Sequence, residues 1–451
     1  MIKTTRETLK ITDFAWSGYG IARDSRGKVV MIPGTVPGDT VNVEIQPSTK
    51  KITLGKILEL IESSGNRVTH PCPHAHEGCV ASLLGNYEYA ASLRWKASHL
   101  EQTIVRVGGL AQLEIEQPLA SPKIWGYRNR LELSLFSINS ADLQTSFKLG
   151  YSSPDRQVPV RCCRLVLESI QQSQQTLFDR LSLLSPLKDR SRHIDKKNES
   201  GARLLLHDNG HDQVVGVVFI EPRTGIEVKS IENWLSCDAL KGWRIHLTPT
   251  MDVRFWRSRV LAQQGDLEIY HPISNDRELC SDPLVFSQAN RAGASYLVST
   301  VMNELNAGGR LLDCYGGYGA FGIAQAQRGG TSVILESSPE AIKAGRNFVK
   351  QHRLPVTFIM ADLNHWKGRK IKWENFPAAI LDPPRRGVNQ RFLEVLKKSG
   401  LPILIYVSCH PAALARDVKI LADRYRPVKI IPLDLFPNTP DLETVVVMYK
   451  K

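Results

Sequence analysis

The chain has 451 residues, 42% of them hydrophobic and 23% charged, a balance ordinary for a globular protein with two or three domains. No apolar run approaches the roughly 20 residues that cross a bilayer, and the N-terminus lacks a secretory pattern. We therefore expect a cytoplasmic protein without a membrane partner. Eight unevenly spaced cysteines exclude a disulfide framework and indicate reduced thiols. The net charge of +13 favours a polyanionic partner.

Residues 1–62 carry short strand patterns separated by turns, with a glycine-rich turn at Ser17-Gly18-Tyr19-Gly20. Strands are expected at Thr4–Asp13, Lys28–Ile32, Thr40–Gln46 and Ile52–Ile61. This pattern is typical of a small β-barrel of the oligonucleotide-binding type. We predict an RNA-binding domain here, with a purely structural N-terminal cap as the alternative.

Residues 63–275 have a mixed pattern that predicts a central α+β domain. The spacing over Trp95–Val107 predicts a helix with its charges opposite the apolar face, ending at Gly108-Gly109. Leu187–Arg203 is polar and basic and is expected to be an exposed loop. Leu204–Ile220 predicts a hairpin around Asp208-Asn209-Gly210.

Residues 276–451 alternate between helical patterns and short apolar strands, which predicts an α/β domain with a parallel sheet and crossover helices. Strands are expected at Arg310–Tyr315, Ser332–Leu335, Val356–Met360, Ala378–Leu381 and Ile403–Val407. Helices are expected at Ser295–Leu305, Phe321–Arg328, Pro339–His352, Arg391–Ser399 and Ala412–Tyr425.

A glycine-rich turn follows the first of these strands and contains Gly317-x-Gly319-x-x-Gly322. Glycines let a backbone approach a ligand closely, and the next helix presents its N-terminal amides to that ligand. Glu336 ends the following strand, about 20 residues on, where a carboxylate accepts ribose hydroxyls. This turn alone fits a nicotinamide dinucleotide as well as S-adenosylmethionine (SAM), and a turn without a ligand is the third interpretation.

Two strand ends further on favour SAM. Asp362 ends the third strand, where it is placed to hold an adenine amino group, and Asp382-Pro383-Pro384-Arg385 ends the fourth. A strand-terminal Asp-Pro-Pro puts a carboxylate and stiff backbone at the edge of the sheet where ligands bind. Methyltransferases that modify nucleotides often have this feature, and dinucleotide dehydrogenases rarely do.

Cys409 follows the next strand, and Glu443 precedes a final apolar strand. Methylation of uracil C5 needs a thiolate that adds to C6, a methyl donor, and a base that removes the C5 proton. A thiol and a carboxylate beside a SAM site supply these groups. A buried structural thiol is the alternative for Cys409 alone.

Five motifs in order resemble the RNA uridine-5-methyltransferase family, and residues 1–62 resemble its TRAM domain, so the likeness covers essentially the whole chain. The motifs are Phe286-Ser-Gln288-Ala-Asn290, Asp313-Cys-Tyr315-Gly, Asp382-Pro-Pro-Arg-Arg-Gly, Ser408-Cys409-His-Pro with Ala415-Arg-Asp, and the Glu443 loop. The resemblance implies a Rossmann-like SAM methyltransferase domain in which Cys409 is the nucleophile and Glu443 the base. It implies that Gln288, Tyr315, Glu336 and Asp382 line the SAM and uracil pocket.

Two positions near the chemistry depart from the family pattern. His410 replaces the usual Asn after the nucleophile, and Asp441 replaces the usual His two residues before the base. An extra carboxylate near Glu443 raises the pKa of its neighbour, so an altered pH profile is expected.

Many family members hold an iron–sulfur cluster on Cys-x5-Cys-x2-Cys and one distant Cys. Here the run is Cys72-x6-Cys79-x2-Ser82, and Cys163 matches the distant ligand. Since such clusters normally take four thiolates, Ser82 puts the 4Fe-4S cluster in question. Zinc at this segment, or no metal, are the alternatives.

The resemblance leaves two other functions open: an RNA cytosine-5-methyltransferase, and an RNA-binding protein with a retired methyltransferase domain. The cytosine enzymes commonly carry a Pro-Cys motif where this chain has Asp382-Pro-Pro. The cluster-bearing relatives mostly act on large-subunit ribosomal RNA, so we expect this protein to act on ribosomal rather than transfer RNA. We also expect a monomer.

Overall fold

A computed structural model describes residues 4–46, 52–110, 113–139, 145–153, 156–185, 201–222, 226–249, 258–274, 277–366 and 371–451. These residues form two compact units. Unit 1 comprises Met1–Trp125, Pro383–Gly387 and Tyr406–Lys451, and unit 2 comprises Gly126–Asp382 and Val388–Ile405. Most of the predicted loop Leu187–Arg203 lies outside the described residues.

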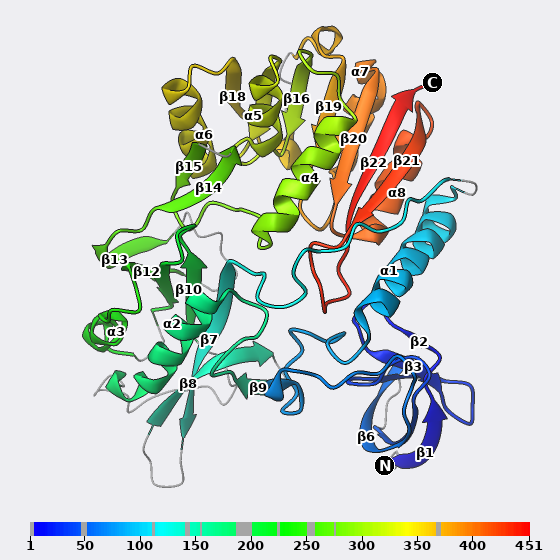
Figure 1. The fold of residues 1–451 in the computed structure, drawn as a ribbon, viewed down its shortest axis with the longest axis vertical. Helices are drawn as coiled ribbons and strands as arrows, with labels where there is room; N and C mark the ends of the chain where they lie inside the picture. Colours follow the sequence, from blue (N-terminus) through cyan, green and yellow to red (C-terminus); the bar gives the residue numbers. More distant parts are fainter. Residues whose placement is uncertain are drawn as a thin grey trace. The chain divides into compact units, whose positions relative to one another are not determined.

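Unit 1 begins with a curled six-stranded sheet in the order β1-β5-β6-β4-β3-β2 (Figure 1). Its strands are β1 (Thr5–Lys10), β2 (Asp13–Phe14), β3 (Gly20–Arg23), β4 (Val29–Ile32), β5 (Thr40–Ile45) and β6 (Ile52–Glu62). Alternate residues of β5 are buried, as expected for a strand with one face on a core. The predicted β-rich fold of this segment is confirmed, and β3 is a strand that was not predicted.

Helix α1 (Tyr89–Thr103) continues into a π-helical turn, η2 (Ile104–Gly108). Glu88 caps its start, because the carboxylate accepts hydrogen bonds from the amides of Ala90 and Ala91 at 2.9 and 2.6 Å. Gly109 ends it in the left-handed region, at φ +66°. The helix predicted at Trp95–Val107 therefore exists and begins earlier.

The rest of unit 1 comes from the C-terminal part of the chain. Helix α8 (Pro411–Leu421) packs against α1 and η2, and β21 (Tyr425–Leu433) pairs antiparallel with β22 (Glu443–Lys450). The predicted helix Ala412–Tyr425 was too long, since Tyr425 already belongs to β21.

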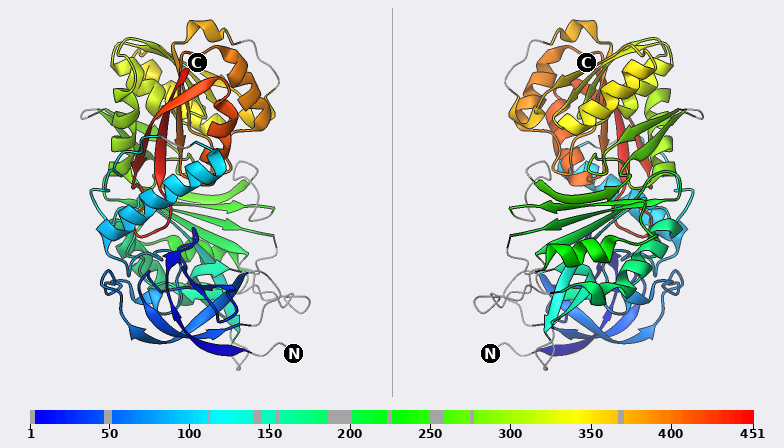
Figure 2. Two further views of the ribbon diagram at one scale, coloured as in Figure 1. Left: turned by 90° about the vertical axis from the view of Figure 1, so that its right-hand side faces the viewer. Right: turned by 90° about the vertical axis from the view of Figure 1, so that its left-hand side faces the viewer.

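Unit 2 contains a seven-stranded sheet in the order β13-β12-β11-β10-β7-β8-β9. The strands are β7 (Arg130–Asn139), β8 (Thr145–Ser153), β9 (Arg156–Pro159), β10 (Ala202–Asp208), β11 (Val214–Ile220), β12 (Gly242–Leu247) and β13 (Arg259–Gly265). Strands β10 and β11 form the predicted hairpin. Helices α2 (Glu168–Asp179) and α3 (Val228–Leu235) lie on one face of this sheet (Figure 2).

A second seven-stranded sheet has the order β18-β17-β16-β19-β20-β22-β21, and the division between the units runs through β20. Its remaining strands are β16 (Arg310–Cys314), β17 (Thr331–Glu336), β18 (Val356–Met360), β19 (Ala378–Leu381) and β20 (Ile403–Ser408). Strand β16 pairs in parallel with β17 and β19, as predicted, while the β21·β22 pair is antiparallel.

Of the four helices in this part of unit 2, three begin at side-chain caps. The four are α4 (Arg291–Asn303), α5 (Ala320–Gln327), α6 (Pro339–Gln351) and α7 (Gln390–Ser399). Asn290, Ser338 and Asn389 cap α4, α6 and α7 through their side-chain oxygens. Strands β14 (Ile269–Ser274) and β15 (Arg277–Ser281) form a separate hairpin before α4.

Short 3-10 turns complete the described elements: η1 (Pro73–Ala75), η3 (Leu181–Leu183), η5 (Leu363–His365) and η6 (Trp373–Asn375). Among the described residues, no helix has both the length and the apolar character needed to pass through a membrane.

Candidate functional site

The glycine-rich turn after β16 has the backbone conformation that the sequence motif requires. Tyr315, Gly317 and Gly319 all have positive φ, at +63°, +57° and +101°. At Gly319, a Cβ would approach Ile334 at 2.7 Å and Phe358 at 3.0 Å, so a side chain there also meets the core. The turn therefore needs its glycines both for conformation and for space.

Glu336 reaches back from the end of β17 to this turn. Its Oε2 accepts a hydrogen bond from the Gly317 amide at 2.9 Å, and its Oε1 accepts bonds from the amides of Ser337 and Ser338 at 2.6 and 2.7 Å. The structure thus brings Glu336 and Gly317 together, and the binding of ribose hydroxyls by Glu336 stays a prediction. The carboxylate is held in one orientation by three backbone donors.

Asp313 lies near the end of β16, and Asp382 directly follows the neighbouring strand β19. Burial raises the pKa of Asp382, and the Asp313 carboxyl adds to that shift. Burial also raises the pKa of Asp313, although a hydrogen bond from the Gly322 amide at 3.0 Å opposes it. Two carboxyls beside one glycine turn favour a ligand that carries positive charge or hydrogen-bond donors. The motif Asp313-Cys-Tyr315-Gly gave no sign that Asp313 is a buried acid with a raised pKa.

Asp362 and Gln288 are the other predicted cofactor residues of unit 2. Burial acts to raise the pKa of Asp362, but hydrogen bonds from His365 and the Asn364 amide, both at 2.9 Å, lower it overall. Gln288 is half-buried, and its backbone carbonyl accepts a hydrogen bond from the Asn129 side-chain amide at 3.3 Å.

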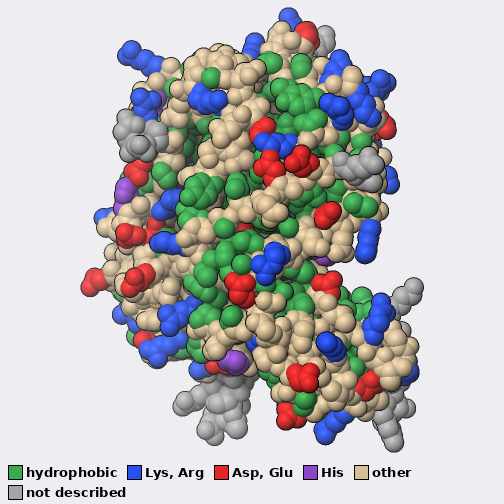
Figure 3. All heavy atoms as spheres, turned by 45° about the vertical axis from the view of Figure 1, so that its right-hand side comes forward, with side chains coloured by type: hydrophobic (Ala, Val, Ile, Leu, Met, Phe, Trp, Pro, Cys, Tyr) green, Lys and Arg blue, Asp and Glu red, His purple; other side chains and the backbone are tan. Residues whose placement is uncertain are grey.

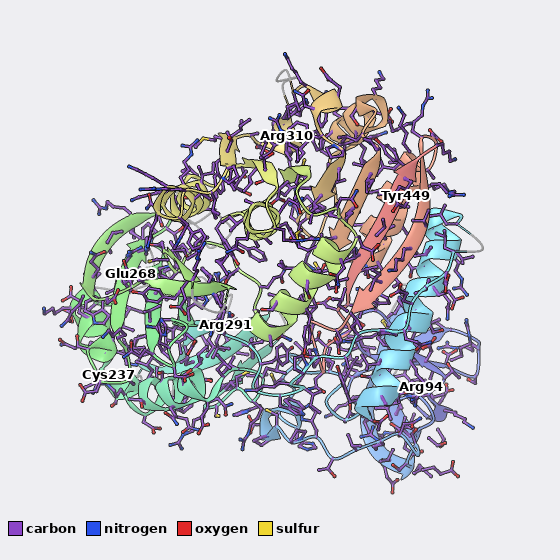
Figure 4. The ribbon with its side chains drawn as sticks, turned by 45° about the horizontal axis from the view of Figure 1, so that its top comes forward. Arg94, Cys237, Glu268, Arg291, Arg310 and Tyr449 are labelled. Carbon is purple, nitrogen blue, oxygen red and sulfur yellow. The ribbon has the colours of Figure 1, made fainter. Side chains whose placement is uncertain are left out.

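The start of α4 is anchored to the central sheet of the same unit. Arg291, labelled in Figure 4, donates to Asp208 Oδ1 at 3.3 Å, and Asp208 is fully buried at the end of β10. Asp208 Oδ2 also accepts a hydrogen bond from Ser169 at 2.8 Å. This ion pair fixes the start of α4 and the preceding segment that carries Gln288. No local sequence pattern predicted the pairing of Arg291 with Asp208.

Cys409 lies in unit 1, between the end of β20 and the first turn of α8. His410 is the N-cap of that helix: its Nδ1 accepts a hydrogen bond from the Ala413 amide at 3.2 Å. The His410 amide donates to Ser408 Oγ at 3.1 Å. The thiol-bearing residue is therefore held on both sides by backbone hydrogen bonds. His410 keeps the capping role that the usual Asn performs well.

Glu443 is 2% exposed and is the first residue of β22. Because α8 connects β20 to β21, these two strands run parallel, and β22 runs antiparallel to β21 between them. The end of β20 and the start of β22 therefore meet at one edge of the sheet. This topology places Cys409 and Glu443 at that same edge, while their chemical roles stay predictions.

A buried ion pair holds the loop that leads to Glu443. Lys96 Nζ on α1 lies 2.7 Å from Asp434 Oδ1, both side chains are fully buried, and Lys96 also donates to the Phe436 carbonyl at 3.1 Å. Burial lowers the pKa of Lys96, while the Asp434 carboxylate opposes that shift. The predicted helix had its charges on the exposed face, so the burial of Lys96 is a finding that the sequence pattern concealed.

Two arginines tie further segments of unit 1 to this region. Arg385 donates to Asp441 Oδ1 at 2.6 Å, so the residue that replaces the usual His carries a counter-ion. Arg416 donates to the fully buried Asp417 at 2.7 Å and to the Arg386 carbonyl at 2.9 Å. The altered pH profile expected from Asp441 stays a prediction, and the Arg385 pair offsets part of its charge.

The cysteine segment at residues 72–82 does not fit a four-thiolate cluster. Cys72 is buried with its Sγ 3.6 Å from His74 Nδ1, and Ser82 Oγ lies 3.3 Å from His70 Nε2. Cys163 belongs to unit 2, where the Tyr151 hydroxyl lies 3.7 Å from its Sγ. Within the part of the chain that the structure describes, no three His, Cys, Asp or Glu side chains are grouped to hold a metal ion.

Comparison with known proteins assigns both ends of the chain. Residues 281–451 match the family model described as tRNA (uracil-5-)-methyltransferase, and residues 4–58 match the TRAM domain. The chain is 28% identical to the 23S rRNA (uracil(1939)-C(5))-methyltransferase RlmD of Shewanella frigidimarina, over 97% of this chain and 94% of that protein. It is also 28% identical to the tRNA (uracil(54)-C(5))-methyltransferase of Pyrococcus abyssi, over 95% and 96% of the two chains.

A solved structure extends the likeness to the fold. The crystal structure of the Pyrococcus abyssi tRNA (uracil-54, C5)-methyltransferase, in complex with S-adenosyl-L-homocysteine, matches with a TM-score of 0.71 at 24% identity. The match covers 98% of this chain and all of that one. The predicted fold class is thereby confirmed. Residues 281–451 therefore form a domain of the tRNA (uracil-5-)-methyltransferase family, and residues 4–58 form a TRAM domain.

Proposed function

We propose that this protein transfers a methyl group from SAM to carbon 5 of a uridine in RNA through a covalent bond between Cys409 and carbon 6. The observation that carries the proposal is the topology of unit 1, which brings the thiol after β20 and the buried carboxylate at the start of β22 to one sheet edge. A nucleophile and a base at one edge are the two groups that this reaction asks of the protein.

Each group then has one chemical task. The Cys409 thiolate adds to C6, and the electron pair of the C5–C6 double bond moves towards C5 and the C4 carbonyl. C5 takes up the methyl group that SAM supplies when bound. Glu443 removes the proton from C5, the double bond forms again, and the C6–S bond breaks to release Cys409.

The glycine turn of unit 2 suits SAM as the donor. In this proposal Glu336, whose carboxylate is held by three amides, accepts the ribose hydroxyls, and Asp362 accepts the adenine amino group. Asp313 Oδ1 is buried and has no hydrogen-bond partner among the described residues, which leaves one acceptor for a ligand. Gln288, Tyr315 and Asp382 complete the proposed SAM and uracil pocket.

We propose ribosomal RNA as the substrate class. Three similar curated proteins, 26–28% identical to this chain, are named 23S rRNA (uracil(1939)-C(5))-methyltransferases. Transfer RNA is the alternative, because the tRNA (uracil(54)-C(5))-methyltransferase of Pyrococcus abyssi is 28% identical. In this proposal residues 1–62 bind RNA, residues 63–275 form the central domain and residues 276–451 carry the chemistry.

Nucleoside mass spectrometry tests the function directly. The purified protein is incubated with methyl-deuterated SAM and, separately, with ribosomal and transfer RNA from a strain that lacks the gene. We expect labelled 5-methyluridine in ribosomal RNA, absent with Cys409→Ala. Label in transfer RNA alone overturns the substrate class. Labelled 5-methylcytidine favours the cytosine enzyme, and no label in either RNA favours a binding protein without catalysis.

The iron–sulfur cluster is a separate question. The two thiols and one hydroxyl of residues 72–82 supply fewer than the four thiolates that such a cluster normally takes. We propose that methyl transfer proceeds without a cluster. Protein purified without oxygen is assayed for iron and for absorption near ~400 nm. Stoichiometric iron that is lost in Cys72→Ser overturns this part of the proposal.

A further inference from the structure

A pocket of about 490 Å³ lies within unit 1, beside the first turn of α8. Its polar lining comes from Trp16, Arg385, Arg386, His410 and Arg416, and two alanines of α8 complete it. The pocket therefore joins the TRAM segment after β2, the loop after Asp382 and the residue next to Cys409. Its volume is in the range of sites that hold a small ligand or one nucleotide.

Three guanidinium groups give this pocket a positive charge. Arg385 and Arg416 each have one carboxylate partner, Asp441 and Asp417. The Arg386 side chain is exposed and has no hydrogen bond or ion pair within the described residues. The face drawn in Figure 3 carries Lys and Arg as well as acidic side chains, with several Lys and Arg side chains grouped at its upper right. Three arginines around one pocket are thus a local concentration of the donors that bind phosphate in bidentate fashion.

Trp16 adds a flat apolar surface to the same pocket. Its indole is half-buried and stacks on His99, with ring centroids 4.8 Å apart and planes at 21°, and it lies 6.2 Å from Trp95. The ring is therefore held in place by other aromatic rings. An aromatic ring beside arginines is the arrangement on which single-stranded nucleic acids stack their bases while the backbone is neutralised.

His410 presents a donor to the pocket. Because its Nδ1 accepts the hydrogen bond from the Ala413 amide, the proton of the neutral ring is on Nε2. The residue directly before it is Cys409. A ligand in this pocket would therefore lie one residue away from the proposed nucleophile.

We propose that this pocket binds the RNA nucleotide next to the target uridine, with its phosphate on Arg386 and Arg416 and its base against Trp16. This inference rests on the proposed function, because it assigns the pocket to the same RNA strand. The chemistry of the pocket selects a nucleotide: arginine forks match the phosphodiester, and the indole accepts any base. The pocket thus positions the strand while Cys409 acts on its neighbour.

Binding of a fluorescein-labelled hexauridylate, measured by fluorescence anisotropy at several salt concentrations, tests the pocket. We expect Arg386→Ala to raise Kd roughly tenfold, because it removes a charge-assisted contact. The slope of log Kd against log salt should fall by about 0.7, the value for one phosphate contact on a single strand. Arg426→Ala is the matched control, since Arg426 is an exposed arginine at the far end of β21. It should change neither quantity.

Trp16 gives the second readout. Trp16→Leu should weaken binding roughly tenfold, with no change in the salt slope, and Trp16→Phe should retain most of the affinity. Arg386 has no partner to lose, so its variant tests the pocket even if Trp16→Leu does not fold. Equal Kd and slope for Arg386→Ala, Arg426→Ala and wild type overturn the pocket, even where the wild type methylates RNA. Arg386-dependent binding without methyl transfer leaves the pocket standing and defeats the proposed function.

Discussion

In the proposed reaction Glu443 only removes the proton from C5. Replacing Glu443 should therefore block this step and leave the addition of Cys409 and the methyl transfer intact. We predict that Glu443→Gln slows turnover at least about 100-fold, because the amide cannot remove the C5 proton. Release of Cys409 requires loss of that proton, so a methylated protein–RNA adduct should accumulate. A denaturing gel with labelled RNA detects the adduct as a slowly migrating band.

The control for this trap is the double variant Cys409→Ala with Glu443→Gln, which should form no band. If Glu443→Gln loses activity and still forms no adduct, then Glu443 acts before the methyl group is transferred. The assignment of Glu443 as the base that removes the C5 proton would then be wrong.

The buried Asp313 carboxyl of the proposed cofactor site should make the stability of the protein depend on pH. Burial raises its pKa from the ordinary 3.8 to about 7, opposed by the Gly322 amide and aided by Glu336. Between these two values the folded protein binds more protons than the unfolded chain, so the free energy of unfolding falls as pH rises. Asp313→Asn keeps an acceptor for Gly322 and removes the titration. We predict that Tm of the ligand-free variant falls less than that of the wild type between about pH 4 and about pH 7. Parallel curves would contradict a raised Asp313 pKa.

At the scale of elements, α1 is a helix that stabilises a distant loop through one buried charge. We predict that Lys96→Met lowers the free energy of unfolding by about 3–5 kcal/mol, because it leaves the Asp434 carboxylate buried without its partner. Adding Asp434→Asn removes that charge and keeps an acceptor for the Phe436 amide, so most of the loss should be regained. Denaturant unfolding measures both.

Lys229→Met is the matched control for this comparison. Lys229 also lies on a helix and pairs with a carboxylate, Glu232 at 2.9 Å, but its side chain is 74% exposed. An exposed pair contributes at most about 1 kcal/mol, so this variant should unfold almost as the wild type does. A loss in Lys96→Met no larger than in Lys229→Met would mean that the buried pair does not hold the loop.

At the scale of the whole molecule, local sequence patterns predicted most strands and helices of the α/β sheet. They did not predict contacts between residues far apart in the chain. The alternation of apolar strands and helices predicted the bounds of β16 to β20 to within about one residue, because glycines, prolines or helix caps flank these strands. Strand β21 was not predicted, since Pro427 and Pro432 interrupt its apolar pattern, and its first residue, Tyr425, was assigned to the preceding helix.

The residues of the candidate site likewise fall into those that local patterns predicted and those that they did not. Strand-end logic predicted Glu336, and the structure joins it to the glycine turn. Lys96 and Trp16 gave no local signal, because their roles depend on residues more than 300 positions away, Asp434 in one case and His410 in the other. Neither helical spacing nor turn chemistry carries information over that distance.

The TRAM domain shares a core with the segment that follows it, so its removal should damage more than RNA binding. Phe14 packs edge-on against Tyr87 and Trp95, with ring centroids 5.2 and 5.3 Å apart, and the Trp95 indole donates to Asp13 at 2.9 Å. Deleting residues 1–62 exposes these aromatic surfaces to water. We predict that proteases then cleave within α1, while unit 2 still binds S-adenosylhomocysteine. Limited proteolysis and calorimetry measure the two effects, with Arg386→Ala as an intact control. If α1 in the truncated chain resists proteases as it does in the wild type, residues 1–62 fold as an independent module. Deleting them would then affect RNA binding alone.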